Sequence, residues 1–109
     1  MKQRREPLPD TDADASFRAL AKALAGLERV DEVAAFLRDL CTPAELEAMA
    51  DRWRVVPLLL KGVPYREIHD LTQVSVTTIG RVARTLERGA GGYAAAVHRQ
   101  QAATASASH

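Results

Sequence analysis

The residues of this chain that could do chemistry gather between Tyr65 and Arg88, and their types fit the recognition of a polyanion. Two short stretches with helical spacing, about 65–71 and 75–88, are separated by a polar break of turn length. The second stretch carries small and hydroxyl side chains near its beginning and arginines further along. Small side chains allow close approach to base edges in the major groove, and neighbouring arginines can contact phosphate. The segment 65–88 therefore predicts a DNA-binding helix-turn-helix.

The apolar residues of this segment support the same prediction. Two short helices that cross steeply share a small core, so they need apolar residues at fixed offsets. Such residues are present on the first helix, in the turn and on the second helix: Ile68, Val74, Ile79 and Val82. With these facing inward, the residues expected to contact DNA are Arg66, His69, Ser75, Val76, Thr77, Thr78, Gly80, Arg81 and Arg84. Of these, Arg66 is expected at a phosphate, and Val76, Thr77 and Gly80 at bases.

Two positions depart from the usual pattern of this motif. Gln73 occupies a turn position where glycine is common, and His69 occupies a position where a small residue is common. A turn can accept glutamine at some cost in backbone energy, and a histidine at the edge of the helix pair can point toward the DNA. The pattern also leaves an alternative open, a protein-interaction module that keeps the helix-turn-helix shape and does not bind DNA.

Charge is distributed unevenly along the chain, although the formal net charge of the 109 residues is only +1. Residues 28–51 contain seven acidic and two basic side chains, whereas residues 52–88 contain seven basic and three acidic ones. One part of the chain can therefore face a polyanion while another does not. Two of the arginines, Arg52 and Arg54, could contact phosphate or pair with nearby acids such as Asp51.

Other classes of function have little support in the sequence. The single cysteine, Cys41, excludes an internal disulfide and a multi-cysteine zinc site, and the three histidines have no metal-binding spacing. There is no nucleophile motif and no glycine-rich phosphate loop, so we expect no enzymatic activity and no metal. No signal peptide and no long apolar run are evident, which leads us to expect a cytoplasmic protein.

Further helices are expected to surround the helix-turn-helix segment and to support it. Helical spacing of apolar residues predicts helices from about Asp14, over about 31–40, over about 43–61 and over about 93–100. The third of these contains Pro57, which removes a helical hydrogen bond, so we expect a kink there. We expect Ser75 to cap the second helix of the helix-turn-helix. No strand-like alternation is present, and the chain is predicted to be all-α.

The expected domain organisation is simple. Residues 13–100 should form one helical domain, which contains the helix-turn-helix at 65–88. Residues 1–12 contain prolines and the basic residues Lys2, Arg4 and Arg5, and we expect them to form a flexible basic arm. Residues 101–109 are rich in alanine and serine, and we expect them to form a disordered tail.

Several motifs in order resemble the Trp-repressor family. They are Leu40-Cys41-Thr42-Pro43-Ala44-Glu45-Leu46, Met49-Ala50-Asp51-Arg52-Trp53, the segment Tyr65–Val82 and Gly91-Gly92-Tyr93. The resemblance covers about residues 16–98, and the YerC-like branch is the most similar one. It implies a six-helix fold in which the N-terminal helices interlock with those of a second subunit. The resemblance thus implies an intertwined homodimer whose two helix-turn-helix units bind DNA. The function it implies is that of a sequence-specific transcriptional regulator, most simply a repressor.

The resemblance also implies a ligand pocket, in which the Trp repressor itself binds L-tryptophan. The residues that would line it here are Thr42, Arg52, Val56, Thr78, Arg81 and Thr85. Two arginines suit the recognition of a carboxylate. However, Val82 replaces the glycine that makes room for the ring, and its side chain should collide with an indole. Asp39 also replaces an apolar lining residue. L-tryptophan is therefore disfavoured, and gating by another small ligand, such as a different amino acid, or no gating at all is expected.

Overall fold

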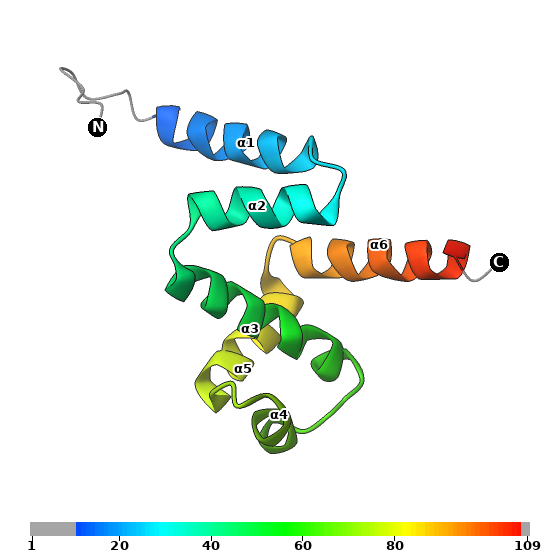
Figure 1. Cartoon of the computed structure of the whole chain (residues 1–109). Helices are drawn as coiled ribbons and strands as arrows, with labels where there is room; N and C mark the ends of the chain where they lie inside the picture. Colours follow the sequence, from blue (N-terminus) through cyan, green and yellow to red (C-terminus); the bar gives the residue numbers. More distant parts are fainter. Residues whose placement is uncertain (1–10, 108–109) are drawn as a thin grey trace. The chain divides into compact units, whose positions relative to one another are not determined.

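The computed structural model describes residues 11–107, and in these residues it contains six α-helices and no strand (Figure 1). The helices are α1 (Thr11–Ala25), α2 (Val30–Leu40), α3 (Pro43–Leu60), α4 (Tyr65–Thr72), α5 (Val76–Arg88) and α6 (Gly92–Ala107). The predicted all-α class is confirmed. The chain divides into two compact units, the first ending at Thr42 and the second beginning at Pro43.

The helices differ from the predicted ones mainly at the two ends of the chain. α1 begins at Thr11, inside the stretch predicted to be a basic arm, and the rest of that stretch lies outside the described residues. α6 continues to Ala107, whereas the sequence predicted a disordered tail from residue 101. Alanine has the highest intrinsic helix propensity, and the alanines between 102 and 107 allow the helix to continue. Residues 108–109 are not among those described.

The first unit has no buried residue among its described positions. The apolar side chains of α1 and α2 are at best half-buried, although both helices have one apolar face. Phe17 on α1 is 68% exposed, and Val30 and Leu40 at the two ends of α2 are also exposed. An amphipathic helix is stabilised mainly by burial of its apolar face. The chain by itself therefore leaves the apolar faces of α1 and α2 incompletely covered.

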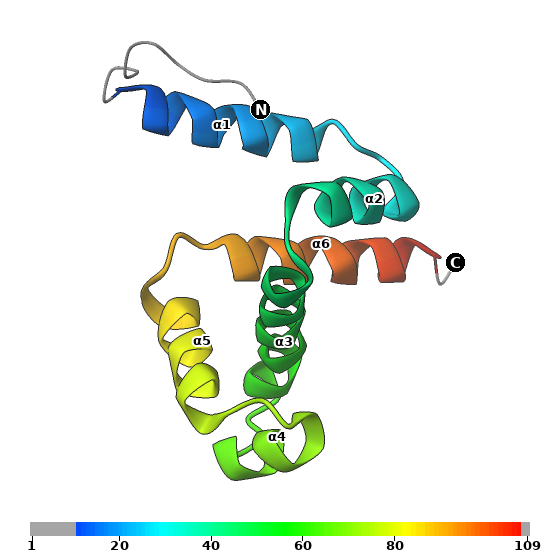
Figure 2. The same cartoon turned by 60° about the vertical axis from the view of Figure 1, so that its left-hand side comes forward.

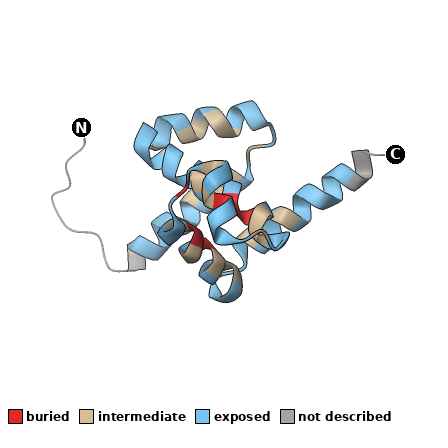
Figure 3. Ribbon diagram, turned by 90° about the horizontal axis from the view of Figure 1, so that it is seen from below, coloured by how far each residue is buried: buried red, intermediate tan, exposed pale blue. Residues whose placement is uncertain are grey.

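The second unit has a small core at the meeting point of α3, α4 and α5. Its buried residues come from all three helices and from the turn between α4 and α5: Val55, Val56, Ile68, Val74, Ile79 and Val82. Figure 3 marks the buried positions in red. The four residues predicted to support the helix-turn-helix from behind are all in this core, so that prediction is confirmed. Half-buried Trp53 and Tyr93, whose ring centroids are 6.4 Å apart, extend the packing from α3 to α6.

The end of α3 directs the chain into the helix-turn-helix. α3 is continuous through Pro57, and the predicted kink stays a prediction. Gly62 adopts a φ of 79°, the left-handed conformation that glycine adopts without strain. The N–H of Val63 donates to the Leu58 carbonyl at 3.1 Å, and the N–H of Gly62 donates to the Leu59 carbonyl at 3.0 Å. This pair of bonds satisfies the last carbonyls of the helix and turns the chain toward α4.

Candidate nucleic-acid interface

α4 and α5 form the predicted helix-turn-helix, and α3 contacts both of them. Figure 2 shows α3 and α5 beside each other, with α4 below them. The residues between α4 and α5, Gln73 to Ser75, make a tight turn. Because Ile68, Ile79 and Val82 are buried on the inner faces, the opposite faces of α4 and α5 are left on the surface.

Gln73 explains how this turn forms without a glycine. Its φ is 65°, so it adopts the left-handed conformation that a turn glycine would adopt. A residue with a Cβ pays about 1–2 kcal/mol for this conformation. The Gln73 N–H donates to the His69 carbonyl at 2.7 Å, and the Gln73 side-chain amide donates to the Asp70 carbonyl at 3.1 Å. These bonds hold the last turn of α4 closed and offset part of the conformational cost.

His69 also has a role within the turn. Its Nδ1 lies 2.8 Å from the Val74 carbonyl oxygen, and the ring is half-buried. A carbonyl only accepts hydrogen bonds, so Nδ1 carries the proton and donates. The sequence showed only that His69 is unusual at this position, and no spacing rule could have found this bond. DNA contact by His69 stays a prediction.

The beginning of α5 is capped as predicted. The Ser75 hydroxyl oxygen accepts the Thr78 N–H at 3.1 Å, and the Ser75 hydroxyl donates to Oγ1 of Thr78 at 3.0 Å. Helix geometry leaves the N–H groups of Val76 and Thr77 without partners inside the helix. Such amides, together with the positive end of the helix dipole, favour an anion such as a DNA phosphate.

The outer face of α5 combines small, hydroxyl and basic side chains. Val76 is 51% exposed, Thr77, Arg81 and Arg84 are exposed, and Thr78 and Gly80 are half-buried. We call this set, together with Ser75, the α5 outer face. Arg66 is exposed on α4. The structure thus brings the predicted DNA-contacting residues together on α4, on α5 and at the cap of α5. Of these, it leaves the side chains of Arg66, Ser75, Val76, Thr77, Arg81 and Arg84 exposed.

Gly80 on this face is not required by packing. A Cβ at Gly80 would have Cε2 of Tyr65 as its nearest neighbour, at 4.0 Å, which is ordinary van der Waals contact. A glycine inside a helix costs about 1 kcal/mol relative to alanine. The glycine leaves the α5 outer face without a side chain at this position.

The residues predicted to bind a small ligand differ from one another in burial, and they do not all belong to the same unit. Val56 is fully buried, whereas Arg52, Arg81 and Thr85 are exposed, and Thr78 is half-buried. Thr42 belongs to the first unit. Val82 is 1% exposed and is packed in the core with Val55 and Val56 of α3. The side chain of Val82 therefore fills the contact between α3 and α5.

The second unit has an open groove that lies away from the residues predicted to bind a small ligand. It has a volume of about 870 Å³ and lies between α3 and α6. Its lining is formed by Trp53, Pro57, Leu60, Lys61, Val97, Gln100, Gln101, Ala103 and Thr104. None of the six predicted ligand residues is in this lining.

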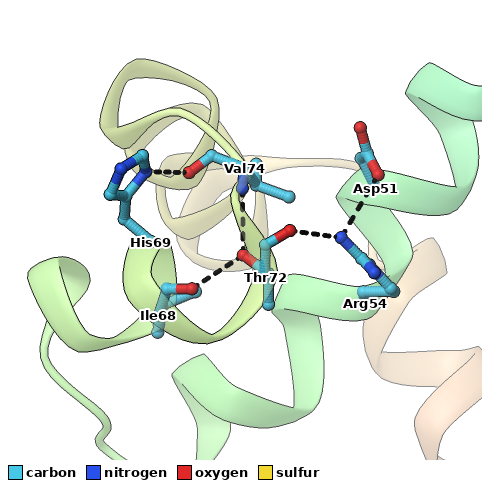
Figure 4. A network of polar contacts seen from close by, with 6 residues as sticks. All are labelled: Asp51, Arg54, Ile68, His69, Thr72 and Val74. Carbon is cyan, nitrogen blue, oxygen red and sulfur yellow. Dashed lines mark hydrogen bonds and ion pairs between the residues drawn. The ribbon is translucent and has the colours of Figure 1, made fainter.

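Arg54 is a residue of the site that sequence reasoning left undecided. Its guanidinium Nη2 donates to the Thr72 carbonyl at 2.6 Å and lies 3.5 Å from Oδ1 of Asp51 (Figure 4). The ion pair is one of the two contacts expected from the sequence. The bond to the end of α4 has no signal in the sequence, because Arg54 and Thr72 are 18 residues apart.

Comparisons with known proteins agree with the fold and with the sequence resemblance. The family model described as Trp repressor protein matches residues 15–101. The uncharacterised protein YerC of Bacillus subtilis is 35% identical over 80 residues, which are 73% of this chain and 77% of YerC. A crystal structure of a candidate Trp repressor from Staphylococcus aureus superposes with a TM-score of 0.75 at 31% identity, covering 80% of this chain and 87% of that one. No described helix is long and apolar enough to cross a membrane.

Proposed function

Because the chain belongs to the Trp repressor family, we propose that it is a transcriptional regulator that binds a specific duplex DNA sequence through α4 and α5, and that it acts as a repressor. The observation that carries this proposal is the α5 outer face. It begins at a capped helix terminus, has small residues at Gly80 and Thr77, and carries Arg81 and Arg84 beyond them. A surface of this kind can approach base edges at its beginning and contact phosphates along its length.

Support for specific binding comes from the rigidity of this surface as well as from its composition. Ile79 and Val82 on the inner side of α5 are fixed in the core, and Ser75 fixes its first turn. A rigid helix presents its side chains to the groove without an ordering cost at the moment of binding. The proposed division of labour is that Val76, Thr77 and Gly80 contact bases while Arg66, Arg81 and Arg84 contact the backbone.

We further propose that the chain forms a homodimer. The apolar faces of α1 and α2 are incompletely covered in the single chain, and Met49 and Leu60 on α3 are exposed as well. Soluble proteins rarely leave so many large apolar side chains in water unless a partner covers them. A second copy fits the family resemblance, which implies interlocked N-terminal helices. Two helix-turn-helix units, one from each subunit, also give the contact area that tight and specific DNA binding needs.

Replacement of Phe17 by serine tests the dimer. In an isolated chain this change at an exposed position would leave stability nearly unchanged. In a dimer the change removes one buried ring from each of the two subunits, so we expect the dissociation constant of the dimer to rise about 100-fold. Sedimentation equilibrium measures this directly. A native chain that sediments at 11.9 kDa at every concentration would contradict the homodimer.

We do not propose that L-tryptophan controls DNA binding, because the side chain of Val82 occupies the contact between α3 and α5. We therefore expect the affinity for DNA to be the same with and without millimolar L-tryptophan. Isothermal calorimetry of the DNA-free protein with L-tryptophan should give no binding heat. Tighter DNA binding in the presence of the amino acid would show that this contact opens. Other amino acids measured in the same series test gating by a different small ligand.

The alternative is that the chain binds another protein through its helix-turn-helix and does not bind DNA. Selection of bound sequences from a pool of random duplexes separates the two functions. We expect enrichment of a defined sequence with two half-sites about 34 Å apart, and an affinity that falls steeply with salt. Failure to retain any duplex at low salt would favour the interaction module.

A further inference from the structure

A continuous set of polar contacts connects α3 to Val74, in the turn that precedes α5 (Figure 4). It begins at Arg54, whose guanidinium donates to the Thr72 carbonyl at 2.6 Å. The Thr72 hydroxyl donates to the Ile68 carbonyl at 2.7 Å and accepts the Val74 N–H at 3.1 Å. Nδ1 of His69 donates to the Val74 carbonyl at 2.8 Å. We call these contacts the turn network.

The first contact of the turn network is chemically favourable. Thr72 is the last residue of α4, and carbonyls in the last turn of a helix have no intrahelical partner. A guanidinium satisfies such a carbonyl with a charge-assisted bond and also lies at the negative end of the helix dipole. Asp51, one turn earlier on α3, faces the same guanidinium at 3.5 Å. The bond to the Thr72 carbonyl, at 2.6 Å, is the shorter of the two contacts and holds Arg54 at the end of α4.

The other contacts fix the residue that precedes the α5 cap. Both backbone polar groups of Val74 are bonded to side chains, its N–H to Thr72 and its carbonyl to His69. Its own side chain is 5% exposed, so it is also held in the core. Ser75, the cap of α5, is the next residue. The direction in which α5 leaves the turn is therefore set by these contacts.

We propose that Arg54 is a positioning residue for sequence reading: it acts through Thr72 to hold the turn between α4 and α5, and it does not neutralise a DNA phosphate. This inference rests on the proposed function. Base contacts by the α5 outer face depend on the orientation of α5 to a fraction of an ångström, whereas attraction to the phosphate backbone tolerates small changes in orientation. Loosening of the turn should therefore reduce discrimination between sequences more than it reduces binding to any duplex.

The salt dependence of binding separates this role from a phosphate contact. Each phosphate contact contributes about 0.9 to the slope of log affinity against log salt concentration. If Arg54 contacted phosphate, its loss would lower that slope by about 1 and weaken binding to all sequences. If Arg54 positions the turn, the slope is unchanged and the ratio of specific to non-specific affinity falls.

The test compares three variants of the full chain with the native protein, using the selected duplex and a scrambled one. Arg54→Met keeps the aliphatic stem of the side chain and removes the donors. Thr72→Val keeps the shape of the side chain and removes the hydroxyl without a change of charge. We expect each to lower the affinity ratio about tenfold, the scale of one such hydrogen bond, at an unchanged salt slope. The control Asp51→Asn leaves the Arg54–Thr72 bond in place and should change the ratio less than twofold.

Hydrogen exchange of the Val74 amide gives a second measurement that requires no DNA. Arg54→Met and Thr72→Val should speed this exchange several-fold, and Asp51→Asn should not. A salt slope lowered by about 1 in Arg54→Met, with the affinity ratio unchanged, would overturn the inference and make Arg54 a phosphate contact. Unchanged exchange and an unchanged ratio in both variants would also overturn it. Absence of DNA binding by the native chain would overturn the proposed function itself, which is a distinguishable result.

Discussion

The Thr77→Asp variant is expected to fold like the native chain and to lose specific DNA binding. Thr77 is exposed in the first turn of α5, where an aspartate interacts favourably with the helix dipole, by about 0.3–1 kcal/mol. The same carboxylate would face the phosphates and the acceptor-rich base edges of the major groove. A like charge brought into an interface costs several kcal/mol, so we expect at least a 100-fold loss of affinity, roughly 3 kcal/mol.

The matched control for this variant is Thr77→Asn, which has nearly the same size as aspartate and no charge. We expect it to keep most of the affinity for DNA and to change which base is preferred at one position of the site. Fluorescence anisotropy with the selected duplex measures affinity, and thermal unfolding verifies the fold. A Thr77→Asp protein that binds the selected duplex as tightly as the native chain would show that the α5 outer face does not enter the groove.

The Ile79→Ala variant is expected to have the largest effect on stability. Ile79 is fully buried where α3, α4 and α5 meet, in a core with few other buried side chains among the described residues. Removal of three carbon atoms from such a position costs about 2–5 kcal/mol, because a cavity is left behind. Native domains are stable by only about 5–15 kcal/mol, so this change removes a large part of the total.

Val76→Ala provides the control on the same helix. Val76 is 51% exposed, so its truncation should leave the melting temperature within a few degrees of the native value. It should, however, weaken binding to the selected duplex, because Val76 is on the α5 outer face. Thermal unfolding followed by circular dichroism measures both variants. Equal stability of Ile79→Ala and Val76→Ala would mean that the core between α3 and α5 is not packed as described.

The parts of this fold that the sequence predicts well are those set by local rules. The apolar residue Ile68 lies before a polar break, and Ile79 and Val82 lie after it at helical spacing. This pattern predicts two helices with a common core. Ser75 is a good cap residue at the correct distance from this apolar pattern, and it does cap α5. Local patterns of this kind depend on few neighbours, so the structure keeps them.

The contacts that the sequence did not predict are polar and depend on the packing of elements. Arg54 meets the end of α4 only because the core brings α3 and α4 together. His69 and Gln73 depart from the common motif, and their compensating bonds exist only in the folded turn. The continuation of α6 to Ala107 is a different case, since helix propensity would have predicted it and the polar composition suggested disorder instead.

Titration of the isotope-labelled full chain with its selected duplex, followed by amide resonances, tests the central claim most directly. We predict that the largest shifts occur from Ser75 to Arg84 and at Arg66, while the amides lining the groove between α3 and α6 change little. Shifts confined to that groove, or no shift at a duplex concentration that saturates binding, would contradict recognition of DNA by the α5 outer face.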